Sequence, residues 1–166
     1  MTKAKPAARP TAKPGRKSRR HRSRELALQG LYQWRVAGGT AEVIEAQLRE
    51  TREFTKTDEG YFSGLLRGVL ANSEELEKQI QSCLDRPLKE LSPVEFAILL
   101  LGAHELASCP EIPYRVVINE SVELAKTYGG TDGHKYVNGV LDKLAAKLRA
   151  VEIKSKIQAK TAIPNG

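Results

Sequence analysis

A dense run of basic residues near the beginning of the sequence is the clearest candidate for a binding site. The nine residues Arg16–Arg24 (RKSRRHRSR) contain six Lys or Arg side chains and one histidine. Guanidinium groups bind phosphate oxygens through paired hydrogen bonds, and counterion release drives such binding. The helix predicted to follow carries Gln29, Tyr32 and Gln33, whose polar and aromatic groups suit unstacked bases. The run favours nucleic-acid binding, with a solvated tail as the alternative on charge alone.

A second candidate is the glycine-rich segment Gly129–Tyr136 (GGTDGHKY). A loop of this kind before a helix presents free amide groups and the positive end of the helix dipole to an anion. His134 and Lys135 add hydrogen-bond donors, and Tyr136 adds a face for stacking. The pattern by itself favours a structural alternative, in which a glycine ends one helix and Asp132 caps the next. It is not a P-loop, because G-x-x-x-x-G-K-[ST] is absent.

No pattern typical of an enzyme occurs in the sequence. His21, His104 and His134 are isolated and form no H-E-x-x-H or comparable metal-ligand set. Neither a G-x-S-x-G nucleophile motif nor a dinucleotide-binding fingerprint is present. Cys83 and Cys109 have no metal-binding spacing and are too few for a disulfide framework. We therefore expect no catalytic activity, no metal and no cofactor, and the cysteine usage indicates a reduced, cytoplasmic setting.

The positive charge of the protein belongs to one end of the chain. The 166 residues carry a formal net charge of +7. Residues 1–24 hold ten Lys or Arg and no acidic residue, whereas the other 142 residues carry 17 basic and 20 acidic side chains. The basic end lacks the apolar segment of a secretory signal, and the longest strongly apolar run, Phe96–Ala103, is too short to cross a bilayer. These features predict a soluble protein with no membrane partner.

Apolar residues recur at helical spacing throughout the middle of the chain. The pattern predicts longer helices over about residues 23–36, 93–108, 114–128 and 132–151. Three further helices are expected, capped by Thr40, by Thr57 and by a capping box at Asn72–Glu75. No convincing strand competes with them. We therefore expect an all-α fold of about seven helices with short connections.

Two local sequence signals predict where individual helices end or begin. Gly38 and Gly39 are expected to end the first helix, because glycine readily adopts positive φ. The sequence Ser92–Glu95 (SPVE) combines a cap, a proline at the first helical position and a glutamate that completes a capping box. The helix that it opens is apolar nearly all round, so we expect it to be the central buried element.

The two ends of the chain differ from the helical middle. Residues 1–19 mix Pro, Ala, Lys and Arg without periodic apolar positions, so they cannot bury enough surface to offset their ordering entropy. We predict that they form a disordered basic tail. Residues 153–166 are polar and end in Pro-Asn-Gly, and we predict a flexible tail there. A helical domain over residues 20–152 remains.

Four segments of the chain carry a resemblance to a known family. In chain order they are R-x-R-x-x-A-L-Q-x-L-Y-Q-W at 22–34, V-x-x-A-x-L-L-L-G-x-x-E-L at 94–106, I-P-Y-R-V-V-I-N-E-S-V-E-L-A-K-T-Y-G at 112–129 and H-K-Y-V-N-G-V-L-D-K-L-A at 134–145. These segments resemble the bacterial NusB family of transcription antitermination factors. The likeness covers about residues 20–150, and the block 112–145 is highly specific.

The resemblance implies a fold, partners and a role in transcription. The fold would be two small helical bundles packed at right angles. The chain would bind single-stranded boxA RNA of nascent transcripts, notably ribosomal RNA leaders, together with NusE, a small-subunit ribosomal protein. With NusA, NusG and RNA polymerase, this complex would make elongation resistant to termination. Some family members also form homodimers.

The resemblance also assigns roles to residues. The arginine-rich motif falls on Arg20, Arg22 and Arg24, with His21 where the family often has arginine. The partner-facing aromatic and acidic positions fall on Tyr32 and Glu95. The motif of loop and helix falls on Asp132, His134, Lys135, Tyr136 and Asn138, and Gly133 stands where the family commonly has a polar residue.

The chemistry of the residues and the resemblance lead to one expected RNA site. We expect a single basic strip with phosphates along Arg20, Arg22, Arg24 and Lys135, and bases on Gln29, Tyr32 and Tyr136. Two other functions stay open. The chain could be a helical interaction module that binds a protein and no RNA, or a NusB-like accessory domain of an RNA methyltransferase.

Overall fold

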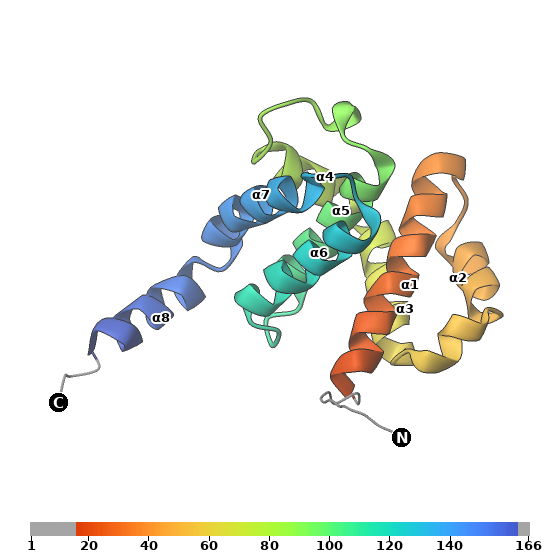
Figure 1. The fold of residues 1–166 in the computed structure, drawn as a ribbon, viewed down its shortest axis with the longest axis horizontal. Coiled ribbons are helices and arrows are strands. Elements are labelled where there is room, and N and C mark those ends of the chain that lie inside the picture. The colour runs from red at the N-terminus through yellow and green to blue at the C-terminus, as the bar shows by residue number, and fades with distance from the viewer. Residues whose placement is uncertain (1–15, 163–166) are drawn as a thin grey trace, which may run out of the picture. The chain divides into compact units, whose positions relative to one another are not determined.

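The protein is helical throughout the part of the chain that the structure describes. The computed structural model describes residues 16–162 and contains eight α-helices, two short 3-10 helices and no strand within that range (Figure 1). The elements are α1 Arg16–Ala37, α2 Ala41–Arg49, η2 Arg52–Lys56, α3 Glu59–Ala71, α4 Ser73–Gln81, η3 Leu88–Glu90, α5 Pro93–Ser108, α6 Tyr114–Tyr128, α7 Gly133–Leu148 and α8 Ala150–Ala162. The predicted all-α class is confirmed.

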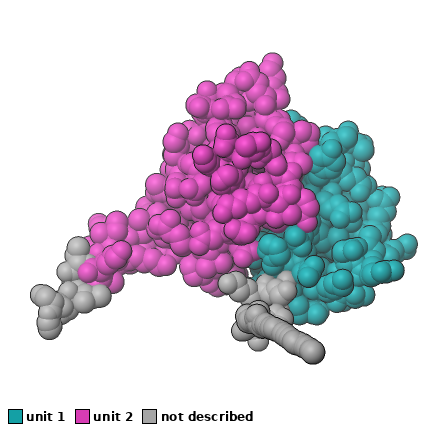
Figure 2. Space-filling view, viewed as in Figure 1, with its two compact units in different colours: residues 1–67 teal, residues 68–166 magenta. Residues whose placement is uncertain are grey.

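The helices form two compact units, which are coloured separately in Figure 2. The boundary falls between Arg67 and Gly68, inside α3. Unit 1 contains α1, α2, η2 and most of α3, and unit 2 contains the end of α3 and the helices from α4 onwards. Each unit has its own apolar core and is described by itself below.

Unit 1 is built around the apolar face of α1, which contacts α2 and η2. Leu28 and Leu31 of α1 are buried, as are the apolar residues of the shorter helices. α1 ends where the sequence predicted, because Gly38 and Gly39 have φ angles of 78° and 114°. The hydroxyl of Thr40 then accepts a hydrogen bond of 3.2 Å from the amide of Val43 and caps α2 as predicted.

Unit 2 is built around α5, which contacts α4, α6 and α7. Every residue from Phe96 to Leu106 is buried, so the predicted central position of this helix is confirmed. Ser92 accepts a hydrogen bond of 3.1 Å from the amide of Glu95, and Pro93 occupies the first helical position. Each large apolar side chain buried here contributes roughly 1.5–3 kcal/mol to stability.

Three helix starts differ from the sequence prediction. α1 begins at Arg16 instead of about Ser23, since Arg and Lys are good helix formers. α3 is capped by Asp58, because the Thr57 hydroxyl donates to the Phe54 carbonyl of η2 at 2.7 Å. The side chain of Asn72 donates to the preceding helix, at the carbonyl of Gly68, and makes no cap bond to α4.

The C-terminal end of the described chain also differs from the prediction. The last predicted helix is divided into α7 and α8, and α8 covers residues that we expected to form a polar tail from residue 153. Ala, Lys and Gln are strong helix formers, and Glu152 pairs with Lys156 one turn later at 3.7 Å. Pro164 and the rest of the predicted tail, like residues 1–15 of the basic tail, lie outside the described residues.

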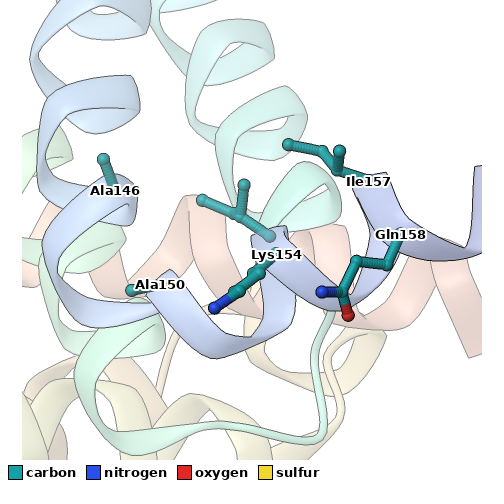
Figure 3. A pocket seen from close by; sticks show the side chains of 6 residues that line it. Ala146, Ala150, Lys154, Ile157 and Gln158 are labelled. Carbon is teal, nitrogen blue, oxygen red and sulfur yellow. The ribbon is translucent and has the colours of Figure 1, made fainter. Parts of the chain in front are cut away.

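A shallow apolar hollow lies where α7 meets α8 (Figure 3). It is lined by Ala146, Ala150, Ile153, Lys154, Ile157 and Gln158. None of these residues belongs to the candidate sites predicted from the sequence, and the hollow lies at the opposite end of α7 from the Gly129–Tyr136 segment.

Candidate nucleic-acid interface

The arginine-rich motif lies in the first turns of α1 and is fixed to the start of α3 within unit 1. Ser23 is fully buried, and its hydroxyl donates to the Asp58 carbonyl at 2.8 Å and accepts from the Asp58 amide at 2.9 Å. Arg19 donates to the carbonyl of Thr57 at 2.6 Å. These contacts fix the rotation of α1 about its own axis relative to the start of α3, and so determine which residues of the motif reach the surface.

Tyr61 of α3 organises two of the predicted arginines. The guanidinium of Arg20 lies over the Tyr61 ring at 4.4 Å from its centroid, and that of Arg24 lies at 5.2 Å. Arg24 also donates to the Tyr61 hydroxyl at 3.1 Å and is only 4% exposed. Arg20 is half-exposed and faces Asp58 at 3.8 Å. Arg24, predicted to contact phosphate, is therefore part of the core of unit 1, whereas Arg20 remains at the surface.

Three of the other predicted residues of α1 are exposed to solvent, and His21 is partly buried. Arg22 and Gln29 are exposed, and the side chain of Tyr32 is 43% exposed. His21 is half-buried and lies 3.5 Å from the carboxylate of Glu25. The surface of α1 thus offers a cation, an amide and an aromatic ring, the groups that contact a phosphate and unstacked bases.

The glycine-rich segment leads into α7 within unit 2. Asp132 and Lys135 are exposed and face each other at 3.6 Å, and Asp132 makes no side-chain cap bond. Asn138 is exposed on the second turn of α7, and His134 is half-buried. As the structural alternative predicted, Gly129 ends α6 and Asp132 occupies the N-cap position of α7, but the Asp132 carboxylate accepts no cap hydrogen bond.

Tyr136 is held by two residues of the connection between α4 and α5. Its hydroxyl donates to Asp85 at 3.2 Å, and the guanidinium of Arg86 lies 4.4 Å from the centre of its ring. Burial, followed by the hydrogen bond to Asp85, raises the pKa of the Tyr136 hydroxyl. The hydrogen bond from Arg86, followed by that from Tyr136, lowers the pKa of the Asp85 carboxyl. The Tyr136 ring is thus held in contact with Asp85 and Arg86 within the protein itself.

Glu95, the predicted acidic contact to a protein partner, lies beside the same loop. Its carboxylate packs against Gly133, where a β-carbon would come within 2.7 Å of Glu95 Oε2. The small residue at 133 therefore leaves space for this half-buried carboxylate. We expected Glu95 to complete the capping box of α5, but its carboxylate instead lies at the first residue of α7.

The structure groups the predicted residues into two clusters, one in each unit. Arg20, His21, Arg22, Arg24, Gln29 and Tyr32 lie along α1, and Glu95, Asp132, His134, Lys135, Tyr136 and Asn138 lie around the start of α7. The single strip across both clusters remains a prediction. Sequence reasoning missed four residues that hold these side chains: Asp58, Tyr61, Asp85 and Arg86. Each lies far along the chain from the residues of the clusters that it contacts, so no local pattern indicates it.

The described part of the chain adds no other candidate site. No group of three or more His, Cys, Asp or Glu side chains between residues 16 and 162 is arranged to hold a metal ion. Within the same range no helix is long and apolar enough to cross a membrane. Cys83 is buried and Cys109 is partly buried, and the two cysteines are not joined by a disulfide.

Comparison with known proteins identifies the family. The model of the NusB family matches residues 21–146. A protein from Nitrosospira multiformis named "Transcription antitermination protein NusB" is 76% identical over 134 residues, which are 81% of this chain and 85% of the relative. A protein of the same name from Nitrosomonas eutropha is 62% identical over 151 residues, covering 88% and 90% of the two chains.

Solved structures agree with the sequence relatives. A NusB structure from T. maritima superimposes with a TM-score of 0.67 and 30% identity, covering 75% of this chain and 89% of that one. A structure described as "Crystal Structure of Antitermination Factors NusB and NusE in complex with dsRNA" gives a TM-score of 0.70 and 26% identity, covering 76% and 96%. The family model spans most of the described residues and both clusters lie within or beside its match, so this chain belongs to the NusB family.

Proposed function

We propose that this protein is a transcription antitermination factor that binds the boxA RNA of nascent transcripts together with NusE. The observation that carries the proposal is the family match over residues 21–146, which includes the start of α7 and all but the first residue of the predicted arginine motif. The relatives named as antitermination proteins support the role in transcription, and the solved complex of NusB and NusE with dsRNA supports RNA and NusE as the partners. This role is regulatory and not enzymatic.

The RNA is proposed to follow the exposed cations and to place its bases on the exposed polar and aromatic groups. Arg20, Arg22 and Lys135 supply phosphate contacts, because they reach solvent. Gln29, Tyr32 and Tyr136 supply base contacts, with His21, Asp132, His134 and Asn138 beside them. Arg24 contributes indirectly, since its guanidinium is used to hold Tyr61. The RNA is proposed to be single-stranded, because stacked and paired bases leave no face for an aromatic side chain.

NusE is proposed to bind through Tyr32 and Glu95. Tyr32 offers a large exposed ring, and Glu95 offers a carboxylate to a basic surface of the partner. In the cytoplasm, the complex of this protein, NusE and RNA is proposed to join NusA, NusG and RNA polymerase. A homodimer is the alternative assembly and would compete for the RNA-binding surface.

The test is fluorescence anisotropy of a short boxA RNA against a scrambled RNA, with and without NusE and at several salt concentrations. We expect a preference for boxA that increases with NusE, and a log–log salt slope of about −0.7 per phosphate contact. A double-stranded boxA probe is expected to bind more weakly. Equal binding to the boxA and scrambled RNAs would leave only a basic helical module, and no binding by a sample verified as monomeric would overturn the RNA proposal.

A further inference from the structure

The connection between α4 and α5 carries a charged pair that lies against the candidate RNA site. Arg86 Nε donates to Asp85 Oδ1 at 3.2 Å, and the Tyr136 hydroxyl donates to the same oxygen, also at 3.2 Å. The Arg86 guanidinium completes the group by lying over the Tyr136 ring at 4.4 Å. These three side chains, Asp85, Arg86 and Tyr136, form a closed cluster that we call the Arg86 cluster.

The Arg86 cluster changes what Tyr136 can offer to a base. One face of its ring is covered by the guanidinium, so a base approaching from that side meets Arg86 first. The side chains of Arg86 and Asp85 are 45% and 67% exposed, so the cluster is open to solvent. A guanidinium is planar and stacks on aromatic rings, and its second face can receive a nucleobase in the same way.

The position of Arg86 is fixed by the turn that carries it. Gln81 at the end of α4 donates to the Arg86 carbonyl at 3.1 Å and accepts from the Leu88 amide at 2.9 Å. Ser82 accepts a hydrogen bond of 3.0 Å from Lys147 of α7. The turn is therefore tied to both α4 and α7. A stacking group on a fixed turn loses less conformational entropy on binding than one on a free loop.

We propose that Arg86 is a base-stacking residue of the RNA site and that Asp85 is the positioning residue that sets its plane. This inference rests on the proposed function. Asp85 accepts from Nε, and the opposite charges of the pair offset each other, so the cluster is poorly suited to a phosphate. Arg86 is therefore expected to add affinity through stacking and to leave the salt dependence of binding unchanged.

The test compares Arg86→Lys with the wild-type protein in the boxA anisotropy titration. Lysine keeps the charge but has no planar group. Stacking of one base changes affinity by about tenfold, so we expect Arg86→Lys to weaken boxA binding by about that factor with an unchanged salt slope. Circular dichroism establishes that the variant is folded.

Arg115→Lys is the matched control. Arg115 also lies over a tyrosine, with its guanidinium 5.0 Å from the Tyr114 ring and a hydrogen bond of 3.1 Å to that hydroxyl. The Tyr114 amide donates to Glu152, which follows α7 in the chain. Tyr136 lies near the start of α7, and residues 137–148 separate it from the end of that helix. At 1.5 Å per residue this is about 18 Å, so Arg115 lies far from Tyr136. Arg115→Lys should bind boxA like the wild type.

The Asp85 role is tested by rescue. Asp85→Ala frees the guanidinium and should reduce the ratio of boxA to scrambled-RNA affinity, whereas Asp85→Asn keeps an acceptor for Nε and should restore that ratio. Asp85→Asn behaving like Asp85→Ala would overturn the positioning role.

Each outcome of the Arg86 titration decides a separate question. If the wild type prefers boxA and Arg86→Lys binds equally well, the stacking inference is wrong and the proposed function stands. A phosphate contact would survive in Arg86→Lys, which keeps the charge, so a phosphate role for Arg86 gives this same result and excludes stacking. If the wild type shows no preference for boxA, the proposed function and the inference fail together.

Discussion

Arg22 and Arg24 lie two residues apart in α1 but have opposite environments. Arg22 is exposed, whereas Arg24 is buried and donates to the hydroxyl of Tyr61. An exposed arginine can exchange water for a phosphate at little cost, while a buried one must first break its internal contacts. Substitution of Arg22 should therefore affect RNA binding, whereas substitution of Arg24 should affect the stability of the fold.

We predict that Arg22→Ala and Arg24→Ala affect different measurements. Arg22→Ala should weaken boxA and scrambled RNA alike and make the salt slope less negative by about 0.7, with the unfolding free energy unchanged within about 0.5 kcal/mol. Arg24→Ala should lower the unfolding free energy by about 1–3 kcal/mol in urea titrations, because Tyr61 loses a hydrogen bond and a packing partner. A stable Arg24→Ala protein with a flatter salt slope would show that Arg24 contacts phosphate directly.

His104 is a buried titratable residue in the core of unit 2. Its imidazole packs against Gly68, and its Nδ1 atom is buried with no hydrogen-bond partner among the described residues. Burial lowers the pKa of His104 from the ordinary value of 6.5, and the nearby charge of Glu105 opposes this more weakly. The folded protein therefore binds a proton less readily than the unfolded chain.

This lowered pKa predicts a loss of stability on acidification. Above about pH 6.5 the imidazole is neutral in both states and adds no penalty. As the pH falls below that value the unfolded chain takes up the proton first, so the unfolding free energy decreases. We expect His104→Gln to reduce this dependence between about pH 7 and pH 5 in urea titrations. Identical pH profiles for the variant and the wild type would contradict the prediction.

Gly133 provides a test of the predicted partner contact of Glu95. A β-carbon at residue 133 would lie 2.7 Å from Glu95 Oε2, so Gly133→Ala must displace the end of that side chain. The end of a glutamate is flexible, and we expect the unfolding free energy to change by less than about 1 kcal/mol. NusE affinity, measured by calorimetry, should fall as much as it does in Glu95→Gln. Unchanged affinity in both variants would remove Glu95 from the interface.

Among the elements, the C-terminal end of α5 depends on a residue that follows α7. Arg149 is buried and donates to the carbonyls of Glu105, Leu106 and Cys109 at 3.1, 2.8 and 2.9 Å. It also pairs with Glu152 in the first turn of α8. Because Glu152 accepts from the first amide of α6, this pair connects four helices of unit 2.

We predict that Arg149→Ala is strongly destabilising. The substitution removes the buried guanidinium from three carbonyls at the end of α5, although those of Glu105 and Cys109 keep a backbone amide donor. It also leaves Glu152 with Lys156 as its remaining cation. The lost hydrogen bonds and packing should cost about 2–4 kcal/mol. Urea unfolding followed by circular dichroism measures this loss. Lys143→Ala, on the exposed face of α7, is the control and should change the unfolding free energy by less than about 0.5 kcal/mol. A comparable change in both variants would exclude the proposed role of Arg149.

Helices were predictable where local signals were complete. α5 begins and ends where the Ser92 cap, Pro93 and the apolar run predicted, since these signals lie within neighbouring residues. α8 was missed because its helix formers carry no buried stripe that periodicity could detect. For α2, a single capping threonine was sufficient.

The environments of the site residues were harder to predict. The contacts of Arg24 with Tyr61 and of Tyr136 with Asp85 join residues 37 and 51 positions apart. Helical periodicity reports which face of one helix is apolar, and it does not report which side chain of another helix faces it. A hint existed for Arg24, which lies one turn before the buried Leu28 on the same face.

At the scale of the whole molecule, charge is divided between a strongly basic end and a slightly acidic remainder. Residues 1–24 hold ten of the 27 Lys and Arg side chains. Four of them, Lys3, Lys5, Arg9 and Lys13, precede α1. A charge-driven contribution to RNA binding acts on every sequence alike, because phosphates are the same in all RNAs.

We predict that replacing these four residues with glutamine weakens RNA binding without changing its specificity. The affinities for boxA and scrambled RNA should fall by the same factor, and the salt slope should become less negative by about 0.7 for each side chain that contacts a phosphate. Anisotropy titrations of the full-length variant at several salt concentrations measure both quantities. An altered ratio of boxA to scrambled affinity would mean that this segment takes part in reading the sequence, and an unchanged salt slope would exclude it from the RNA contact. The expected result would assign specificity to the polar and aromatic groups of α1 and α7 and general affinity to the basic end.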